Sequence, residues 1–140
     1  MKASDLRIGD YVKVKPSGMI IQVAAVHNKK VAYHAVINKL SWVKECLLEP
    51  IRLSAIEKTL WLNGFHKNIK ANDARYEDSV LGEFIVLADN YTNATVVNRH
   101  TKAQGDDYNG NVEYLHELQH IMSDCKLTKK IKYDRKSGNN

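Results

Sequence analysis

Apolar and polar residues alternate over short stretches in the first fifty residues of the chain. The segment Tyr11–Val14 alternates behind a Gly-Asp turn, and Pro16-Ser17-Gly18 supplies the turn that follows it. Three more strand-like stretches occupy residues 19–26, 31–37 and 42–48. Short strands at such close spacing are typical of small barrels, so we expect residues 1–50 to form an SH3-like β-barrel.

The pattern changes after Pro50, because the residue before a proline favours extended geometry and marks a boundary. Ser54 and Glu57 match a capping box at the start of a helix that Gly64 would end, with Ile56, Leu60 and Trp61 as its buried residues. Strand-like stretches at 74–77, 82–87 and 94–98 precede a second helix at 112–125, and residues 127–131 resemble a short final strand. We therefore expect an α+β fold, with an α-β-β-β-α subdomain over residues 51–131 and a basic, polar, disordered tail over residues 132–140.

The bulk composition is that of an ordinary globular protein, with 44% hydrophobic and 26% charged residues. The first residues do not resemble a signal peptide, and no stretch has the length of a membrane-spanning helix. We therefore expect a cytoplasmic protein without a membrane partner. Cys46 and Cys125 are too few for a disulfide framework, and we expect both to be thiols that behave as small buried hydrophobic residues.

The net charge of +5 is concentrated near the C-terminal end. Residues 1–125 carry 15 bases and 15 acids, whereas residues 126–136 carry six bases and one acid. A basic tail can add salt-sensitive affinity for nucleic acid, and its candidate phosphate contacts are Lys126, Lys129, Lys130, Lys132, Arg135 and Lys136. The alternative interpretation is a solvated end that only improves solubility.

One segment matches a known catalytic spacing: His116-Glu117-Leu118-Gln119-His120, an H-E-x-x-H on the second predicted helix. Two histidines four residues apart lie on one face of a helix and can share a zinc ion. Glu117 would then act as general base on a metal-bound water. The sequence thus raises the hypothesis of a zinc-dependent hydrolase.

Two observations weaken that hypothesis. On a helical wheel the apolar stripe of residues 112–125 centres near about 280°, whereas His116 and His120 fall at about 40° and 80°. The pair should therefore face solvent beside Glu113 and Glu117, whose carboxylates would favour protonated imidazoles.

A catalytic zinc also needs a third protein ligand. The metzincin continuation would place Gly at Ser123 and His at Lys126, and the twenty residues after His120 contain no glutamate. His34, His66 and His100 are upstream candidates whose spacing gives no reason to choose among them.

Three stretches carry a family resemblance: Leu6-Arg7-Ile8-Gly9-Asp10-Tyr11-Val12, then Pro50-Ile51-Arg52-Leu53-Ser54 with Gly64-Phe65, then Val112 to Gln119 with Leu127-Thr128. Together they resemble a family of small uncharacterised proteins of Bacteroidetes genomes and their phages or prophages. In that family the His116 position is histidine, the Glu117 position is usually glutamine, and the His120 position is usually not histidine. The resemblance therefore argues against zinc peptidase chemistry as a family trait and supplies no activity of its own.

We interpret the chain as a non-enzymatic binding module of phage or mobile-element origin, without a cofactor, acting on nucleic acid or on a host protein. Tyr11, Tyr33 and Trp42 could stack on bases, but they do not interleave with basic residues as in a single-strand platform. Core packing is the interpretation that we prefer for Tyr33 and Trp42. The alternative function is a zinc hydrolase with His116 and His120 as ligands and Glu117 as base.

Overall fold

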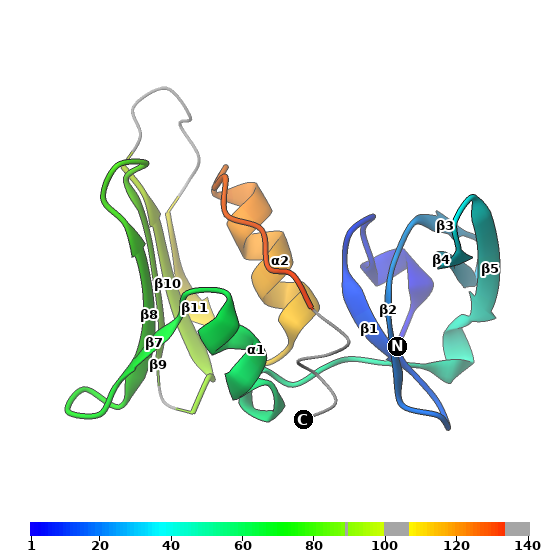
Figure 1. Cartoon of the computed structure of the whole chain (residues 1–140), viewed down its shortest axis with the longest axis horizontal. Helices are drawn as coiled ribbons and strands as arrows, with labels where there is room; N and C mark the ends of the chain where they lie inside the picture. Colours follow the sequence, from blue (N-terminus) through cyan, green and yellow to red (C-terminus); the bar gives the residue numbers. More distant parts are fainter. Residues whose placement is uncertain (89, 100–106, 134–140) are drawn as a thin grey trace. The chain divides into compact units, whose positions relative to one another are not determined.

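A computed structural model describes residues 1–88, 90–99 and 107–133 of the chain. The chain divides into two compact units, Met1–Ile51 and Arg52–Asn140, one residue beyond the boundary drawn at Pro50. The predicted α+β class is wrong, because the described residues are mostly β and form eleven strands and only the two helices α1 and α2 (Figure 1). Neither of these helices is long and apolar enough to span a membrane.

Six strands pair into two antiparallel, three-stranded sheets in the first unit, in the orders β2-β1-β6 and β3-β4-β5. Their bounds are Tyr11–Val14 for β1, Met19–Gln22 for β2, Ala25–His27 for β3, Lys30–Val36 for β4, Lys39–Lys44 for β5 and Leu48–Glu49 for β6. Two short 3-10 turns complete the unit: Ala3–Asp5 (η1) precedes β1, and Glu45–Leu47 (η2) connects β5 to β6. The core of the unit is aliphatic and consists mainly of Leu6, Val12, Val14, Ile21, Val23, Val31 and Leu48.

The predicted SH3-like barrel is wrong. Every residue of the first unit is described, and these residues form two separate sheets and no closed barrel. The stretch 19–26, expected as one strand, changes sheets in the middle. Val23 exchanges backbone hydrogen bonds with Gly9 and Asp10, whereas the N–H of Ala24 donates to the carbonyl of Ala32 at 2.8 Å. A single β-branched run therefore supplies two strands, and its composition gives no sign of the change.

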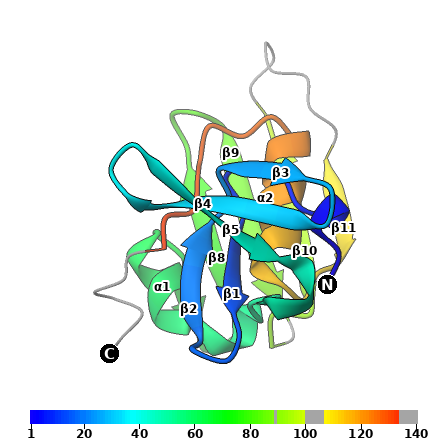
Figure 2. The same cartoon turned by 90° about the vertical axis from the view of Figure 1, so that its right-hand side faces the viewer.

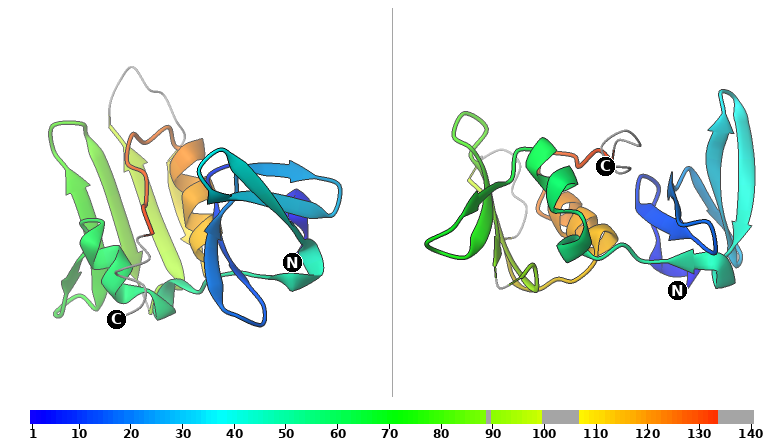
Figure 3. Two further views of the ribbon diagram at one scale, coloured as in Figure 1. Left: turned by 45° about the vertical axis from the view of Figure 1, so that its right-hand side comes forward. Right: turned by 60° about the horizontal axis from the view of Figure 1, so that its bottom comes forward.

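The second unit is built on a five-stranded antiparallel sheet in the order β11-β10-β9-β8-β7. Its strands are β7 His66–Asn68, β8 Asp73–Asp78, β9 Glu83–Ala88, β10 Asn93–Asn98 and β11 Tyr108–Asn111. Helices α1 (Glu57–Leu62) and α2 (Leu115–Asp124) lie on one side of this sheet (Figures 1 and 3). The covered face is apolar, with buried Ala74, Ile85, Leu87, Ala94 and Val96.

The predicted three-stranded sheet of the α-β-β-β-α arrangement is wrong, and so is the predicted final strand. The sheet has five strands, because β7 and β11 add an edge on either side. Both are polar stretches that lack the alternation of a half-buried strand. Residues 127–131, all of them described, form no strand.

α1 is also shorter than predicted. It begins at Glu57 with Ile56 as its N-cap residue, because Leu53–Ala55 form a 3-10 turn (η3) in place of the first helical turn. Ser54 lies inside that turn and is not the cap. Leu60 is buried as expected, whereas Trp61 is exposed.

Both cysteines are free thiols. Cys125 is buried as expected, but Cys46 lies exposed in η2, so its prediction as a small core residue is wrong.

Candidate nucleic-acid interface

The β3-β4-β5 sheet has one face packed on the core and one face turned away from it. Val26, Val31, Tyr33 and Val43 point to the core cluster of the unit. Cross-strand partners share a face, so the register places a second set on the opposite side. This second set, which we call the outer face, consists of Ala25, His27, Lys30, Ala32, His34, Leu40, Trp42 and Lys44.

Trp42 lies on the outer face in β5, an edge strand of the sheet, with 48% of its surface exposed. Its ring meets the ring of His27 edge-on, with centroids 6.4 Å apart and planes at 75°. The backbones of β5 and β3 are separated by β4, a distance of about 10 Å. The indole must therefore extend across β4 above Ala32, its cross-strand neighbour, which has no exposed surface. The prediction that Trp42 is a core residue is wrong, whereas Tyr33 does lie on the inner face.

His27 is held at the edge of the outer face by a local turn. Asn28 follows it with a φ of 53°, a left-handed conformation that asparagine tolerates. The amide nitrogen Nδ2 of Asn28 lies 3.2 Å from Nε2 of His27. This contact restrains the imidazole, which forms the T-shaped pair with the indole.

The charge on this sheet has a single sign. Residues 24–44 contain four lysines, Lys29, Lys30, Lys39 and Lys44, and no aspartate or glutamate. The next acid, Glu45, accepts a hydrogen bond from the backbone N–H of Ala3 at 2.8 Å. The first unit as a whole has eight bases and four acids. The neutral balance of residues 1–125 therefore hides a basic first unit, offset by acids further along the chain.

The predicted basic tail is partly built into the second unit. Leu127 and Ile131 are buried, and the backbone N–H and hydroxyl of Thr128 donate to the carboxylate of Glu83. Asn63 receives the backbone N–H of Lys132 at 2.8 Å and donates to its carbonyl at 2.9 Å. The segment is thus held to the second unit by backbone hydrogen bonds, by the hydroxyl of Thr128 and by two buried side chains.

This arrangement separates the six candidate phosphate contacts. The side chains of Lys126, Lys130 and Lys132 are exposed. Lys129 instead lies over the ring of Tyr76, its nitrogen 4.7 Å from the centroid, and burial lowers its pKa. Arg135 and Lys136 lie outside the described residues. Of the six candidate phosphate contacts, three therefore lie within the described residues with exposed side chains.

His116 and His120 lie together, but His116 does not face solvent as predicted, and His120 is half-buried. His116 is buried, with 9% of its surface exposed. Its ring stacks on Tyr114 at 5.9 Å and meets the ring of His120 edge-on at 5.7 Å. A helical wheel gives only the angle between a residue and the apolar stripe. It cannot show that the ring of Tyr114 stacks on His116.

Glu117, the candidate general base, has a structural role. Its Oε1 accepts the backbone N–H groups of Glu113 and Tyr114 at 3.1 and 3.0 Å, which caps the first turn of α2. Glu113 itself pairs with Arg52. Both carboxylates beside the histidines are therefore engaged, with the helix end and with an arginine.

The described residues bring no third metal ligand to the pair. Among them, no group of three or more His, Cys, Asp or Glu side chains is arranged to hold a metal ion. His66 lies in β7 on the sheet of the second unit and His34 lies in β4 of the first unit. His100 lies outside the described residues. The zinc hypothesis stays a prediction, which elemental analysis of the purified protein can test.

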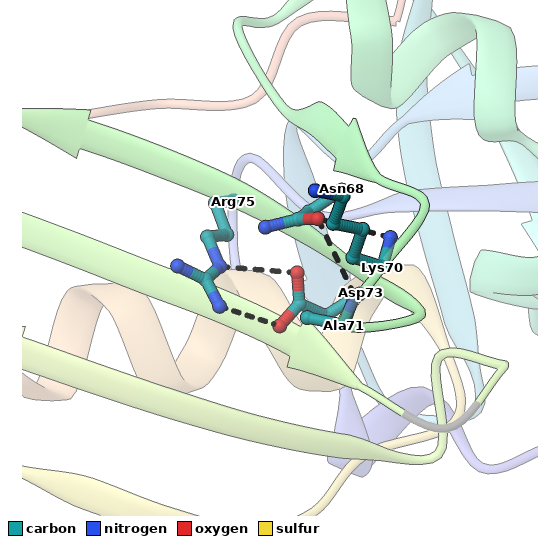
Figure 4. A network of polar contacts seen from close by, with 5 residues as sticks. All are labelled: Asn68, Lys70, Ala71, Asp73 and Arg75. Atoms are coloured by element: carbon teal, nitrogen blue, oxygen red, sulfur yellow. Dashed lines mark hydrogen bonds and ion pairs between the residues drawn. The ribbon is translucent and has the colours of Figure 1, made fainter.

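A further cluster of charges lies on the β7–β8 hairpin (Figure 4). Nε and Nη2 of Arg75 donate to the two carboxylate oxygens of Asp73 at 3.0 and 3.1 Å, and this contact raises the pKa of the guanidinium. Asn68 Oδ1 accepts the N–H groups of Lys70 and Ala71 and closes the turn. These charges are balanced within the hairpin, so the cluster does not present a field of one sign.

Comparison of the chain with protein-family models, with curated proteins and with solved structures finds no significant match. The resemblance to the Bacteroidetes and phage family stays a prediction, and the functional argument depends on the chain's own residues.

Proposed function

We propose that this protein is a non-enzymatic module that binds single-stranded nucleic acid on the outer face of the β3-β4-β5 sheet. The observation that carries the proposal is the half-exposed indole of Trp42, which lies on a sheet face whose charged residues are all lysines. Aromatic rings that receive stacked bases, set among cations that contact the backbone, are the usual components of such a surface.

Stacking supplies one part of the affinity. A base stacked on an aromatic side chain contributes about 1–3 kcal/mol, and the contribution depends little on sequence because every base has a π-face. The rings of Trp42 and His27 form a T-shaped pair, and Ala32 is the cross-strand partner of Trp42. The exposed face of the indole is thus already positioned for a base.

Lysines supply the other part. Lys30 and Lys44 lie directly opposite each other, two residues from the Ala32–Trp42 pair on the same face. Two residues along a strand correspond to about 7 Å. A phosphate between the two ammonium groups would be adjacent to a base stacked on Trp42, and it would relieve the repulsion between them.

The exposed lysines of the C-terminal segment, Lys126, Lys130 and Lys132, are secondary contacts in this proposal. They would add affinity that depends on salt and not on sequence. We further propose a cytoplasmic location and a mobile-element origin, which follow from the sequence and its resemblance.

The direct test is fluorescence anisotropy of a labelled single strand of about 15 nucleotides, titrated with the full chain at several salt concentrations. We expect binding at low salt and a linear loss of log affinity with log salt. No binding at low salt would rule the proposal out, as would an affinity that does not change with salt.

A further inference from the structure

The β4–β5 hairpin ends in apolar residues that no part of its own sheet covers. Ile37 at the tip is 87% exposed and Val36 beside it is 63% exposed. The tip projects from the sheet as a loop (Figure 2), and Asn38 closes it with a φ of 63°. Lys39 begins the returning strand directly opposite Val36.

We propose that Val36 and Ile37 form a wedge that inserts between bases where a duplex opens into single strands. This inference rests on the proposed function, because the separated strand would pass to the outer face. The substrate class is therefore nucleic acid with a junction between double-stranded and single-stranded segments.

Three features of the hairpin support this assignment. Apolar side chains that enter a base step unstack it, which is how several nucleic-acid-binding proteins deform a duplex. The tip and Trp42 are on one hairpin, about 13 Å apart along β5, a length of roughly four stacked nucleotides. The register shift between His34 and Val36 is a bulge, which bends a strand and increases its twist, and so aims the tip differently from the sheet.

The charge around this tip favours nucleic acid over an uncharged apolar partner. Its nearest charged residue in sequence is Lys39, and the strands that carry it contain only lysines as charged residues. A phosphate backbone complements such a surface on both sides of an inserted side chain.

The test compares three labelled ligands: a fork with single-stranded arms, the matching single strand and the matching closed duplex. A 2-aminopurine base at the fork junction reports unstacking. The variants are Ile37→Ser, Trp42→Ala and the control Ile69→Ser, which removes an equally exposed isoleucine (88%) from the second unit.

We expect the wild-type chain to bind the fork about tenfold more tightly than the single strand and to raise 2-aminopurine fluorescence. Ile37→Ser should lose both effects, and Ile69→Ser should lose neither. Equal affinity for fork and single strand would overturn the wedge while leaving the proposed function intact. Absence of binding to all three ligands would overturn both.

Self-association is the remaining outcome. A concentration-dependent dimer in sedimentation that Ile37→Ser abolishes, without any loss of fork preference, would identify the tip as a contact between copies and overturn the wedge.

Discussion

Lys30 on β4 and Lys44 on β5 lie directly opposite each other on the outer face of their sheet. Like charges in this position destabilise a sheet by up to about 1 kcal/mol. We therefore expect Lys30→Gln and Lys44→Gln each to raise the free energy of unfolding by a few tenths of a kcal/mol at low salt. Each should also reduce the slope of log affinity against log salt by about 0.7.

Urea denaturation and anisotropy measure these two effects on the same variants. Lys58→Gln, which removes an exposed lysine from α1, is the matched control and should change neither. If both outer-face variants keep the full salt slope, these lysines do not contact phosphate.

Glu83 connects the C-terminal segment to the sheet of the second unit. Its buried carboxylate accepts hydrogen bonds from Thr128 and from the N–H of Lys129. Glu83→Ala leaves these donors without their acceptor, so we expect a loss of about 3 kcal/mol in the free energy of unfolding. Glu77→Ala on β8 removes an exposed carboxylate and should change stability by less than about 0.5 kcal/mol. Equal effects of the two substitutions would refute the anchoring role of Glu83.

Substitutions of Glu117 have different expected effects if the residue is a helix cap and if it is a general base. Glu117→Ala removes the acceptor of two backbone N–H groups and should cost about 1 kcal/mol of stability. Glu117→Gln retains an oxygen acceptor, as capping boxes allow, and should cost little. A zinc hydrolase would instead lose activity in both variants. Thermal denaturation of the two variants distinguishes these roles.

The metal itself is checked by elemental analysis of protein purified without added zinc, followed by melting in chelator. A fold that holds no zinc has the same melting temperature with and without chelator, and this is the result that we expect. Stoichiometric zinc that His116→Ala removes would revive the hydrolase hypothesis.

Ionisation of Tyr91 lowers the stability of the folded chain at alkaline pH. Burial, with a contribution from the nearby carboxylate of Glu57, raises the pKa of its phenol to about 12, against about 10 in an unfolded chain. Between these values the unfolded state alone releases the proton. The stabilisation is therefore complete below about pH 10 and is lost as the pH rises towards 12.

Urea midpoints measured from pH 8 to 12 should fall over this window in the wild type and less steeply in Tyr91→Phe. Tyr108→Phe, which removes a phenol from β11, is the control and should retain the wild-type fall. An identical fall in Tyr91→Phe would assign the alkaline loss to other groups.

The sequence predicted most strand positions but not how the strands assemble. Alternation marks Tyr11–Val14, whereas a run of apolar residues marks Glu83–Ala88, in which every second residue is buried. Such patterning locates strands. It cannot show that residues 19–26 belong to two sheets, because both halves are equally β-branched. The short polar edges β7 and β11 carry no pattern, since neither buries a face.

Only part of the candidate site can be predicted from the sequence. Trp42 and Lys44 are two residues apart, so a strand places them on the same face, and the lysine marks that face as solvent-exposed. This spacing predicts an exposed Trp42, in contrast to the expectation of a core residue from its apolar ring. In contrast, the burial of His116 depends on the ring of Tyr114, and the role of Glu83 depends on residues 45 positions away. The pattern of apolar and polar residues predicts neither the stacking of His116 on Tyr114 nor the hydrogen bonds of Glu83.

The central claim is that Trp42 stacks on a nucleic-acid base, and a comparison of the two exposed tryptophans tests it most directly. Trp61 in α1 is 60% exposed and belongs to the second unit, so Trp61→Ala is a matched control for Trp42→Ala. With a single-stranded ligand at low salt, we predict that Trp42→Ala weakens binding by about 10- to 100-fold and that Trp61→Ala retains wild-type affinity. Equal affinity of the wild type and Trp42→Ala, with both variants folded by circular dichroism, would contradict the account.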